Sequence, residues 1–144
     1  MSLHGTYDPD NIFAKIIRGE MPCVKVYEDD NVLSFMDVFP QCEGHTLVIP
    51  KAPSRNLLEM NAKDIGRLFG AVQRITKAVE TSLKPEGITI TQFNGAPAGQ
   101  TVFHTHVHIL PRYDGKALGA HGGAGAMANM DELKALAEKI SAAL

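Results

Sequence analysis

The chain has 144 residues, about one domain's worth, and its 44% hydrophobic and 21% charged residues are ordinary for a globular protein. The net charge of −2, without a basic run or an acidic tail, argues against nucleic acid as a partner. No apolar stretch approaches a membrane span, so no membrane partner is expected. The N-terminus lacks a signal-peptide pattern, and we expect a cytoplasmic protein with two reduced thiols, Cys23 and Cys42.

The first half of the chain predicts a tail, a short helix, three strands and a long helix. We expect residues 1–10 to be a flexible tail and residues 11–144 to be a single domain with a C-terminal helix. Asp10 or Asn11 is expected to cap the short helix. The long helix carries apolar residues three or four positions apart, which indicates one buried stripe. The predicted ranges are Asn11–Arg18 and about Asn61–Leu83 for the helices, and Val24–Glu28, Val32–Asp37 and His45–Pro50 for the strands.

The second half predicts two more strands, an irregular segment and a last helix. The Gly/Ala-rich segment Gly115–Gly125 is expected to lie on the surface or against a second subunit. Hairpin-linked strands with separate helices indicate the α+β class and not a parallel βαβ sheet. The predicted ranges are Gly87–Phe93 and Thr101–Leu110 for the strands, Asn94–Gly99 for the loop between them and Met130–Leu144 for the helix.

Three histidines in the last predicted strand carry most of the functional information. His104, His106 and His108 are spaced by two, so a strand would place all three imidazoles on one face. One ring could then attack phosphorus while a neighbour binds a phosphate oxygen or protonates a leaving group. A single strand histidine is usually only a polar residue, but three in alternation are hard to explain structurally.

Zinc is the chemical alternative, because neutral imidazoles on one strand face can ligate this metal. The preceding loop favours phosphate instead. Its sequence NGAPAGQT, residues 94–101, offers glycines, backbone N–H groups and a hydroxyl, which can together form a concave site for an anion. A glycine-rich loop alone would be a weak signal; the loop and the histidines together predict a phosphate site.

The segment His104–Leu110 resembles the His-x-His-x-His-x-x pattern of the histidine-triad (HIT) family. The preceding Gly99–Val102 is similar to the family as well. Further matches in order and spacing lie at Ile12–Arg18, Phe35–Asp37 and Gly44–Lys51. The resemblance covers about residues 11–113, and the C-terminal helix is similar to that of bacterial members.

This resemblance implies a fold and a reaction. Members have an antiparallel sheet, here of five strands, with flanking helices, and usually form homodimers whose sheets join. They bind purine nucleoside phosphates and cleave at the α-phosphorus through a nucleotidyl-histidine. By the family pattern His106 is the nucleophile, His108 contacts the α-phosphate, and His104 and His45 orient and tune the nucleophile.

The resemblance also implies nucleotide contacts. Thr101 and the backbone of Gly99 and Gln100 would hold phosphate or leaving-group atoms, and Asp37 would bind the ribose hydroxyls. Members often have an amide where this chain has Phe93, so the neighbouring Asn94 is expected to serve. The expected wall of the base pocket is Ile12, Phe13, Ile16, Phe35, Val38 and Leu47.

Ordinary roles stay open for these residues. The apolar six could be plain core, and Asp37 could only initiate a turn. His4 and His121 have no support in the pattern and are taken as incidental. Many bacterial relatives carry Cys-x-x-Cys, which forms a zinc site with two histidines. Asn11 and Ala14 stand there in this chain, so we predict no metal and no cofactor.

The expected function is therefore hydrolysis or nucleotidyl transfer on purine nucleoside phosphoramidates or phosphate esters, such as adenosine phosphoramidate. A dinucleoside polyphosphate hydrolase is the nearest alternative, because Gln100–Thr101 and Leu110–Arg112 also resemble that branch. A non-catalytic nucleotide-binding protein and a strand-borne metal module are the other readings.

Overall fold

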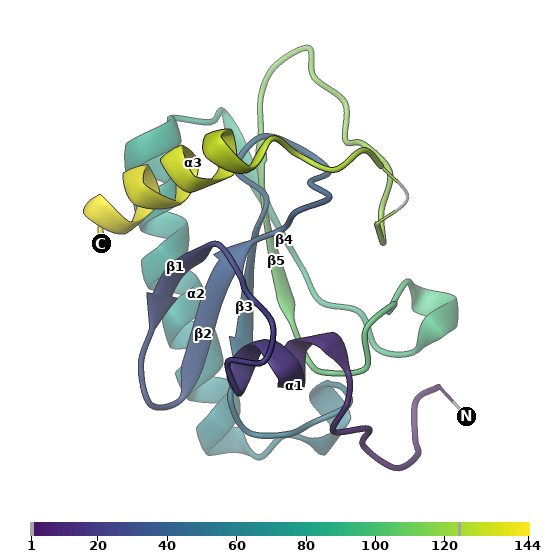
Figure 1. Ribbon diagram of the computed structural model, residues 1–144. Coiled ribbons are helices and arrows are strands. Elements are labelled where there is room, and N and C mark those ends of the chain that lie inside the picture. The colour runs from purple at the N-terminus through teal and green to yellow at the C-terminus, as the bar shows by residue number, and fades with distance from the viewer. Residues whose placement is uncertain (1, 124) are drawn as a thin grey trace.

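The computed structural model describes residues 2–123 and 125–144, so Met1 of the predicted tail and Ala124 of the Gly/Ala-rich segment lie outside it. Five strands form one antiparallel sheet in the order β1-β2-β3-β5-β4 (Figure 1). This confirms the predicted α+β class and five-stranded antiparallel sheet. The strands are β1 (Lys25–Glu28), β2 (Val32–Met36), β3 (Thr46–Pro50), β4 (Gly87–Thr91) and β5 (Val107–Arg112).

The helices begin at asparagines that cap them. In α1, α2 and α3 the capping side chain accepts a hydrogen bond from a backbone N–H in the first turn, which satisfies a donor with no partner inside the helix. None of the helices in the described parts of the chain is long and apolar enough to cross a membrane. The helices are α1 (Ile12–Ile17), α2 (Ala62–Leu83) and α3 (Met130–Ala142), with short 3₁₀ helices at Leu57–Glu59 and Ala96–Ala98.

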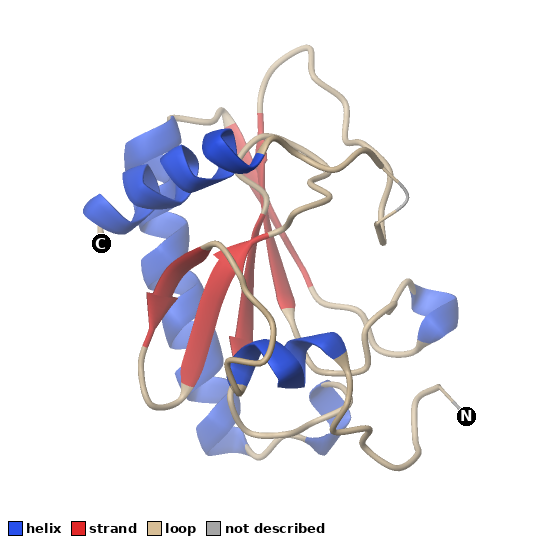
Figure 2. Ribbon diagram, viewed as in Figure 1, coloured by secondary structure: helices blue, strands red, loops and turns tan. Residues whose placement is uncertain are grey.

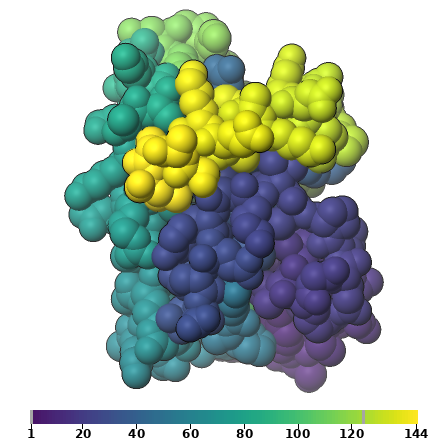
Figure 3. Space-filling view, turned by 60° about the vertical axis from the view of Figure 1, so that its left-hand side comes forward, coloured from purple at the N-terminus to yellow at the C-terminus, as the bar shows by residue number. Residues whose placement is uncertain are grey.

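The sheet is covered on both faces. All five residues of β2 are buried, and successive side chains point to opposite faces. Val32 and Met36 therefore join the larger core with α2 and α3, while Leu33 and Phe35 join a smaller cluster beneath α1. Figure 1 shows α1 in front of the sheet and α2 behind it. Figure 3 shows α3, in yellow, lying across the chain beside α2.

The predicted strand Thr101–Leu110 is wrong at both ends. β5 begins at Val107 and continues through Pro111 to Arg112. Pro111 is tolerated because β3 pairs with β5 only as far as Ile109, so the position that lacks an N–H faces an open edge on that side. His104 and His106 thus precede the strand, and only His108 belongs to it.

The N-terminal segment lies against the loop that follows β3. The guanidinium of Arg55 donates to the backbone carbonyls of Ser2 and Thr6, and the amide of Asn56 donates to that of Leu3. Residues 2–10 are therefore held by hydrogen bonds to residues about 50 positions away. The predicted flexibility of this segment and the domain boundary at residue 10 stay predictions.

Candidate active site

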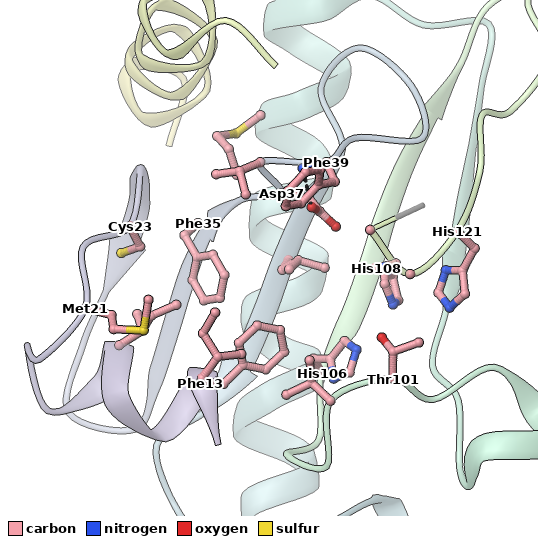
Figure 4. A pocket seen from close by; sticks show the side chains of 18 of the residues that line it. Phe13, Met21, Cys23, Phe35, Asp37, Phe39, Thr101, His106, His108 and His121 are labelled. Atoms are coloured by element: carbon pink, nitrogen blue, oxygen red, sulfur yellow. Dashed lines mark hydrogen bonds between the residues drawn. The ribbon is translucent and has the colours of Figure 1, made fainter. Parts of the chain in front are cut away.

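A cavity of about 360 Å³ opens on the face of the sheet that carries α1. Its walls come from α1, β2, β3, the residues before β5 and the Gly/Ala-rich segment (Figure 4). Figure 2 shows that much of this side of the molecule is irregular chain, in tan, while α2 and α3 lie on the other side. The predicted site residues that line the cavity are Ile12, Phe13, Ile16, Phe35, Asp37, Val38, Leu47, Thr101, His106 and His108.

The cavity has an apolar end and a polar end. Phe13 and Phe35 lie at the apolar end with their rings edge to face and their centroids 5.5 Å apart. Phe13 also contacts the ring of His106, at 4.9 Å between centroids, which is where the polar end begins. Asp37 and Thr101 lie farther along the polar side (Figure 4). Such a cavity suits a flat apolar group joined to a polar one.

His106 has one nitrogen committed and one available. Its Nδ1 lies 2.7 Å from the backbone carbonyl of His104, so Nδ1 carries the proton and donates it. The lone pair of the neutral ring is then on Nε2. Burial lowers the pKa of His106 to about 4, so the ring is neutral at pH 7. A neutral imidazole with a free lone pair is the form that acts as a nucleophile.

A chain of hydrogen bonds fixes the proton of His108. The backbone N–H of Gln41 donates to His45 Nδ1 at 3.1 Å, so His45 carries its proton on Nε2. That nitrogen lies 2.9 Å from His108 Nδ1 and donates to it, which leaves the His108 proton on Nε2. Burial lowers the pKa of His45 to about 4 and that of His108 to about 2, so both rings are neutral.

His108 Nε2 is therefore a donor with a defined direction. The atom is buried and has no hydrogen-bond partner among the described residues. Buried donors normally have a partner, because an unpaired one costs about 1–3 kcal/mol. His108 lines the cavity beside His106, with their ring centroids 5.0 Å apart. The pair presents a lone pair and an N–H side by side, which suits attack on a phosphorus whose oxygen is hydrogen-bonded.

His104 supports this arrangement from behind the cavity. Its ring is fully buried and does not line the cavity. Its Nε2 donates to the carbonyl of Pro50 at 2.7 Å, and its Nδ1 accepts from the hydroxyl of Tyr7 at 2.6 Å. Burial raises the pKa of Tyr7, so the phenol stays protonated and donates. Two fixed partners thus hold His104, whose backbone carbonyl in turn orients His106.

Asp37 combines the two roles considered for it. Its Oδ1 accepts from the backbone N–H of Phe39 at 2.8 Å, which is the turn-initiating role. Its carboxylate also lines the cavity, and Oδ2 lies 3.6 Å from His45 Nε2 (Figure 4). Burial raises the pKa of Asp37. Because His45 is neutral, this contact is not an ion pair, and Oδ2 keeps acceptor capacity for hydroxyl groups.

The glycine loop is built differently from the expectation. The N–H groups of Gly99 and Gln100 bond to carbonyls of the same loop. The buried amide of Gln100 accepts from the backbone of Gly95 and donates to the carbonyls of Arg55 and Val102. These donors are spent on folding the loop, so the structure does not bring Gly99 or Gln100 to the cavity.

Asn94 is likewise used inside the fold. Its amide oxygen accepts from the backbone N–H of Leu57 at 3.0 Å and from the amide of Gln92 at 2.8 Å. Its amide nitrogen donates back to Gln92. Asn94 does not line the cavity, whereas Thr101, at the end of the loop, does.

Sequence reasoning missed His121. This residue lines the cavity, donates from Nε2 to the carbonyl of Gly99 at 2.6 Å, and packs its ring 5.5 Å from that of His108. Gly122 and Gly123 follow it with φ of +72° and +81°, and a Cβ on Gly122 would lie 2.8 Å from a methyl carbon of Thr101. The one signal in the sequence was this glycine pair, which permits a backbone conformation and an approach that other residues disfavour.

Comparison with known proteins decides the family. The HIT domain family matches residues 18–115. This chain belongs to the histidine-triad (HIT) family. A HIT-like protein from Bartonella henselae, whose structure is described as containing an unknown ligand, is 49% identical, with a TM-score of 0.88 over 96% of this chain and 100% of that one.

Two curated HIT relatives are named as enzymes. The adenylylsulfatase HINT3 of Arabidopsis thaliana is 40% identical over 115 residues, which cover 80% of this chain and 58% of the relative. The adenosine 5'-monophosphoramidase hnt1 of Schizosaccharomyces pombe is 36% identical over 130 residues, which cover 90% of this chain and 95% of the relative. Hydrolase activity of the HIT type is thus supported for this chain.

The residues of this HIT protein do not fit zinc at the positions where relatives carry cysteines. The side chain of Asn11 caps α1 by accepting from Ala14, and Ala14 offers no ligand atom. Asp37, His45 and His108 do place one ligand atom each within 4.8 Å of one another. However, the two nitrogens are 2.9 Å apart, a hydrogen-bond distance, whereas nitrogens at tetrahedral zinc would be about 3.3 Å apart. The absence of a metal and a cofactor stays a prediction.

Proposed function

We propose that this HIT protein cleaves purine nucleoside monophosphate derivatives at the α-phosphorus through a covalent nucleotidyl-His106 intermediate. One observation carries the proposal. The Nε2 lone pair of His106 lies beside the Nε2–H of His108, and backbone groups fix both tautomers. The printed names of the two enzyme relatives, an adenylylsulfatase and an adenosine monophosphoramidase, support it, because both describe bonds to an adenylyl group.

In the first step, His106 Nε2 attacks the α-phosphorus in line. The N–P bond forms, and the bond from phosphorus to the leaving group breaks, with its electron pair going to the leaving group. The ring becomes cationic, and its Nδ1–H stays hydrogen-bonded to the carbonyl of His104. His108 Nε2–H donates to a phosphate oxygen on which charge develops. A fixed donor of this kind stabilises a transition state without reorganisation.

In the second step, water attacks the phosphorus of the adduct. The N–P bond breaks, its electron pair returns to His106 Nε2, and the water proton goes to solvent with release of the nucleoside monophosphate. Splitting one displacement into two gives each step a lower barrier. Thr101, which is exposed and lines the cavity, is placed to donate its hydroxyl hydrogen bond to the phosphate in both steps.

The apolar end of the cavity is proposed to bind the base. Phe13, Phe35 and Leu47 offer flat and branched apolar surfaces of the kind that bind aromatic rings. Asp37 lies between this end and the histidines, where a ribose would connect base and phosphate, and its carboxylate can accept from two adjacent hydroxyls. We propose a purine base, as the family resemblance implies.

We also propose a homodimer in the cytoplasm. β4 is an edge strand of the sheet, and its Ile90 is 41% exposed. An open edge with an exposed apolar side chain can pair with a second copy. Light scattering of the purified protein should give twice the mass of one chain; the mass of a single chain would contradict this part of the proposal.

The test is a substrate panel with wild type, His106→Ala and, as a matched control, His4→Ala. His4 is an exposed histidine that does not line the cavity. Adenosine phosphoramidate, adenylyl sulfate and a diadenosine polyphosphate are the substrates. We expect His106→Ala to lower kcat at least about 10³-fold, with AMP affinity within a few-fold of wild type and His4→Ala unchanged.

Each other outcome has a defined meaning. Full activity of His106→Ala would overturn the nucleophile. AMP binding without turnover of any substrate by wild type would make this chain a nucleotide-binding protein and overturn the enzymatic proposal. Turnover of the diadenosine polyphosphate alone would assign the chain to that branch and overturn the proposed substrate class.

A further inference from the structure

The proposed substrate is an anion, yet none of the described residues that line the cavity is a lysine or an arginine. A positive charge in the cavity must therefore come from an imidazole. His106, His108 and His121 are the three candidates. Burial lowers the pKa of His106 and of His108 far enough that both are neutral at pH 7. His121 is the remaining group.

The hydrogen-bond partners of His121 favour its charged form. Its Nε2 lies 2.6 Å from the carbonyl of Gly99, and its Nδ1 lies 3.4 Å from the amide oxygen of Gln41. That amide is oriented by its nitrogen, which donates to the carbonyl of Gly119 at 3.2 Å and so turns the oxygen toward His121. Both partners are acceptors. A neutral imidazole can donate to only one of them, whereas an imidazolium donates to both.

The charges around His121 agree with this assignment. A positive charge on His121 adds to burial in lowering the pKa of His45, His106 and His108. The same charge lowers the pKa of Asp37 and so opposes the effect of burial on that carboxyl. The titratable groups that face His121 are thus three neutral rings and one carboxyl. A single cation at His121 keeps the nucleophile neutral and compensates charge on the ligand.

The position of His121 matches the leaving group. Phe13 contacts His106 from the apolar end, where the base is proposed to bind. His121 lies beyond His108 from that end, beside Thr101 (Figure 4). A nucleotide whose base occupies the apolar end and whose α-phosphorus lies at His106 therefore directs its leaving group toward His121. The contact of Gly122 with Thr101 holds the segment that carries His121 against this end.

We propose that His121 forms a leaving-group subsite that selects nucleoside monophosphate derivatives with an anionic leaving group, such as sulfate or phosphate, over those that release an amine. This inference rests on the proposed function. In the favoured reaction the N–P bond to His106 forms, the P–O bond breaks, and sulfate leaves with the electron pair as a dianion. Sulfate needs no proton to leave, and an adjacent cation stabilises the charge that it gains. Ammonia from a phosphoramidate gains no such charge.

The experiment compares kcat/KM for adenylyl sulfate and adenosine phosphoramidate in wild type, His121→Gln, His121→Lys and the His4→Gln control. Glutamine keeps a hydrogen-bond donor without the charge, and lysine keeps the charge. We expect His121→Gln to lower kcat/KM about tenfold on adenylyl sulfate and less than twofold on the phosphoramidate. We expect His121→Lys to recover part of the loss and His4→Gln to behave as wild type.

Two results would overturn the inference while leaving the proposed function standing. Equal losses on both substrates would mean that His121 only supports the fold of the segment, and no loss on either would mean that it has no part in turnover. Failure of the wild type on both substrates would instead count against the proposed function. Thermal unfolding of each variant separates a folding defect from a change of selectivity.

Discussion

The two ends of the cavity are built by different means. The apolar end comes from regular elements: Phe13 lies on α1, Phe35 on β2 and Leu47 on β3, and all three belong to one buried cluster. The polar end comes mostly from irregular chain, and only His108 lies on a strand. The binding surface therefore follows from periodic packing, whereas the chemistry depends on hydrogen bonds between segments far apart in the sequence.

The two ends also differ energetically. Burial of aromatic and aliphatic surface stabilises the apolar end at about 25 cal/mol per Å². At the polar end, burial works against the charged form of each imidazole and lowers the pKa of His45, His106 and His108. Changes at the polar end should therefore alter kcat and acid stability, and changes at the apolar end should alter KM.

The largest of these effects is expected for His108→Asn. The shorter side chain withdraws the donor that faces the phosphate, while its amide can still accept from His45. We expect kcat to fall about 100-fold or more, as for loss of a donor to a developing oxyanion, with KM within a few-fold. Steady-state kinetics on adenosine phosphoramidate measure both constants. An unchanged kcat would show that this donor does not act in the transition state.

Acid should destabilise the protein through its polar end. The unfolded chain binds protons near pH 6.5, but the folded chain takes them up on His45 and His106 only near pH 4. Their contribution to stability is therefore complete above pH 6.5 and is lost as pH falls toward 4. From pH 6.5 to 5.5 the free energy of unfolding should fall by about 1 kcal/mol for each such histidine.

Urea unfolding at a series of pH values measures this slope. The His108→Asn variant is the matched control, because it removes one histidine with a strongly lowered pKa and should therefore give a shallower slope. An unfolding free energy that stays constant between pH 6.5 and 5.5 would mean that the buried rings of the folded protein titrate as they do in the unfolded chain.

A smaller effect is expected at the apolar end for Phe35→Leu. Leucine keeps the site apolar but removes the aromatic face that is proposed to stack on the base. We expect KM to rise about fivefold and kcat to stay within twofold. Leu33→Val is the control, since Leu33 lies in the same cluster but does not line the cavity. It should lower stability without changing KM; equal KM changes in both variants would indicate a general packing effect.

The sequence allowed the regular elements to be predicted but not their pairing. Apolar alternation predicted a strand from Thr101, yet the ladder between β3 and β5 ends at Val107. Beyond it, the backbone of Thr105 donates to Ser54, and the ring of His104 donates to the carbonyl of Pro50. Alternation reports which side chains are buried; it does not report which backbone groups find a strand partner.

The candidate site was predictable to the same degree. The apolar wall was found because its residues follow helix and strand periods. The contacts of Tyr7 with His104 and of His121 with Gly99 join positions 97 and 22 residues apart, and no local pattern encodes them. Gln100 matched the family pattern, but its donors are spent inside the loop, which only the three-dimensional structure reveals.

The central claim is that His106 becomes covalently nucleotidylated, and trapping the intermediate tests it most directly. Wild type and His106→Asn are mixed with adenylyl sulfate, quenched within one turnover in alkali, and mapped by tandem mass spectrometry. We predict one adenylyl group on His106 of the wild type and none on the variant. Formation of AMP within that turnover without any adduct, or with the adduct on another residue, would contradict the mechanism.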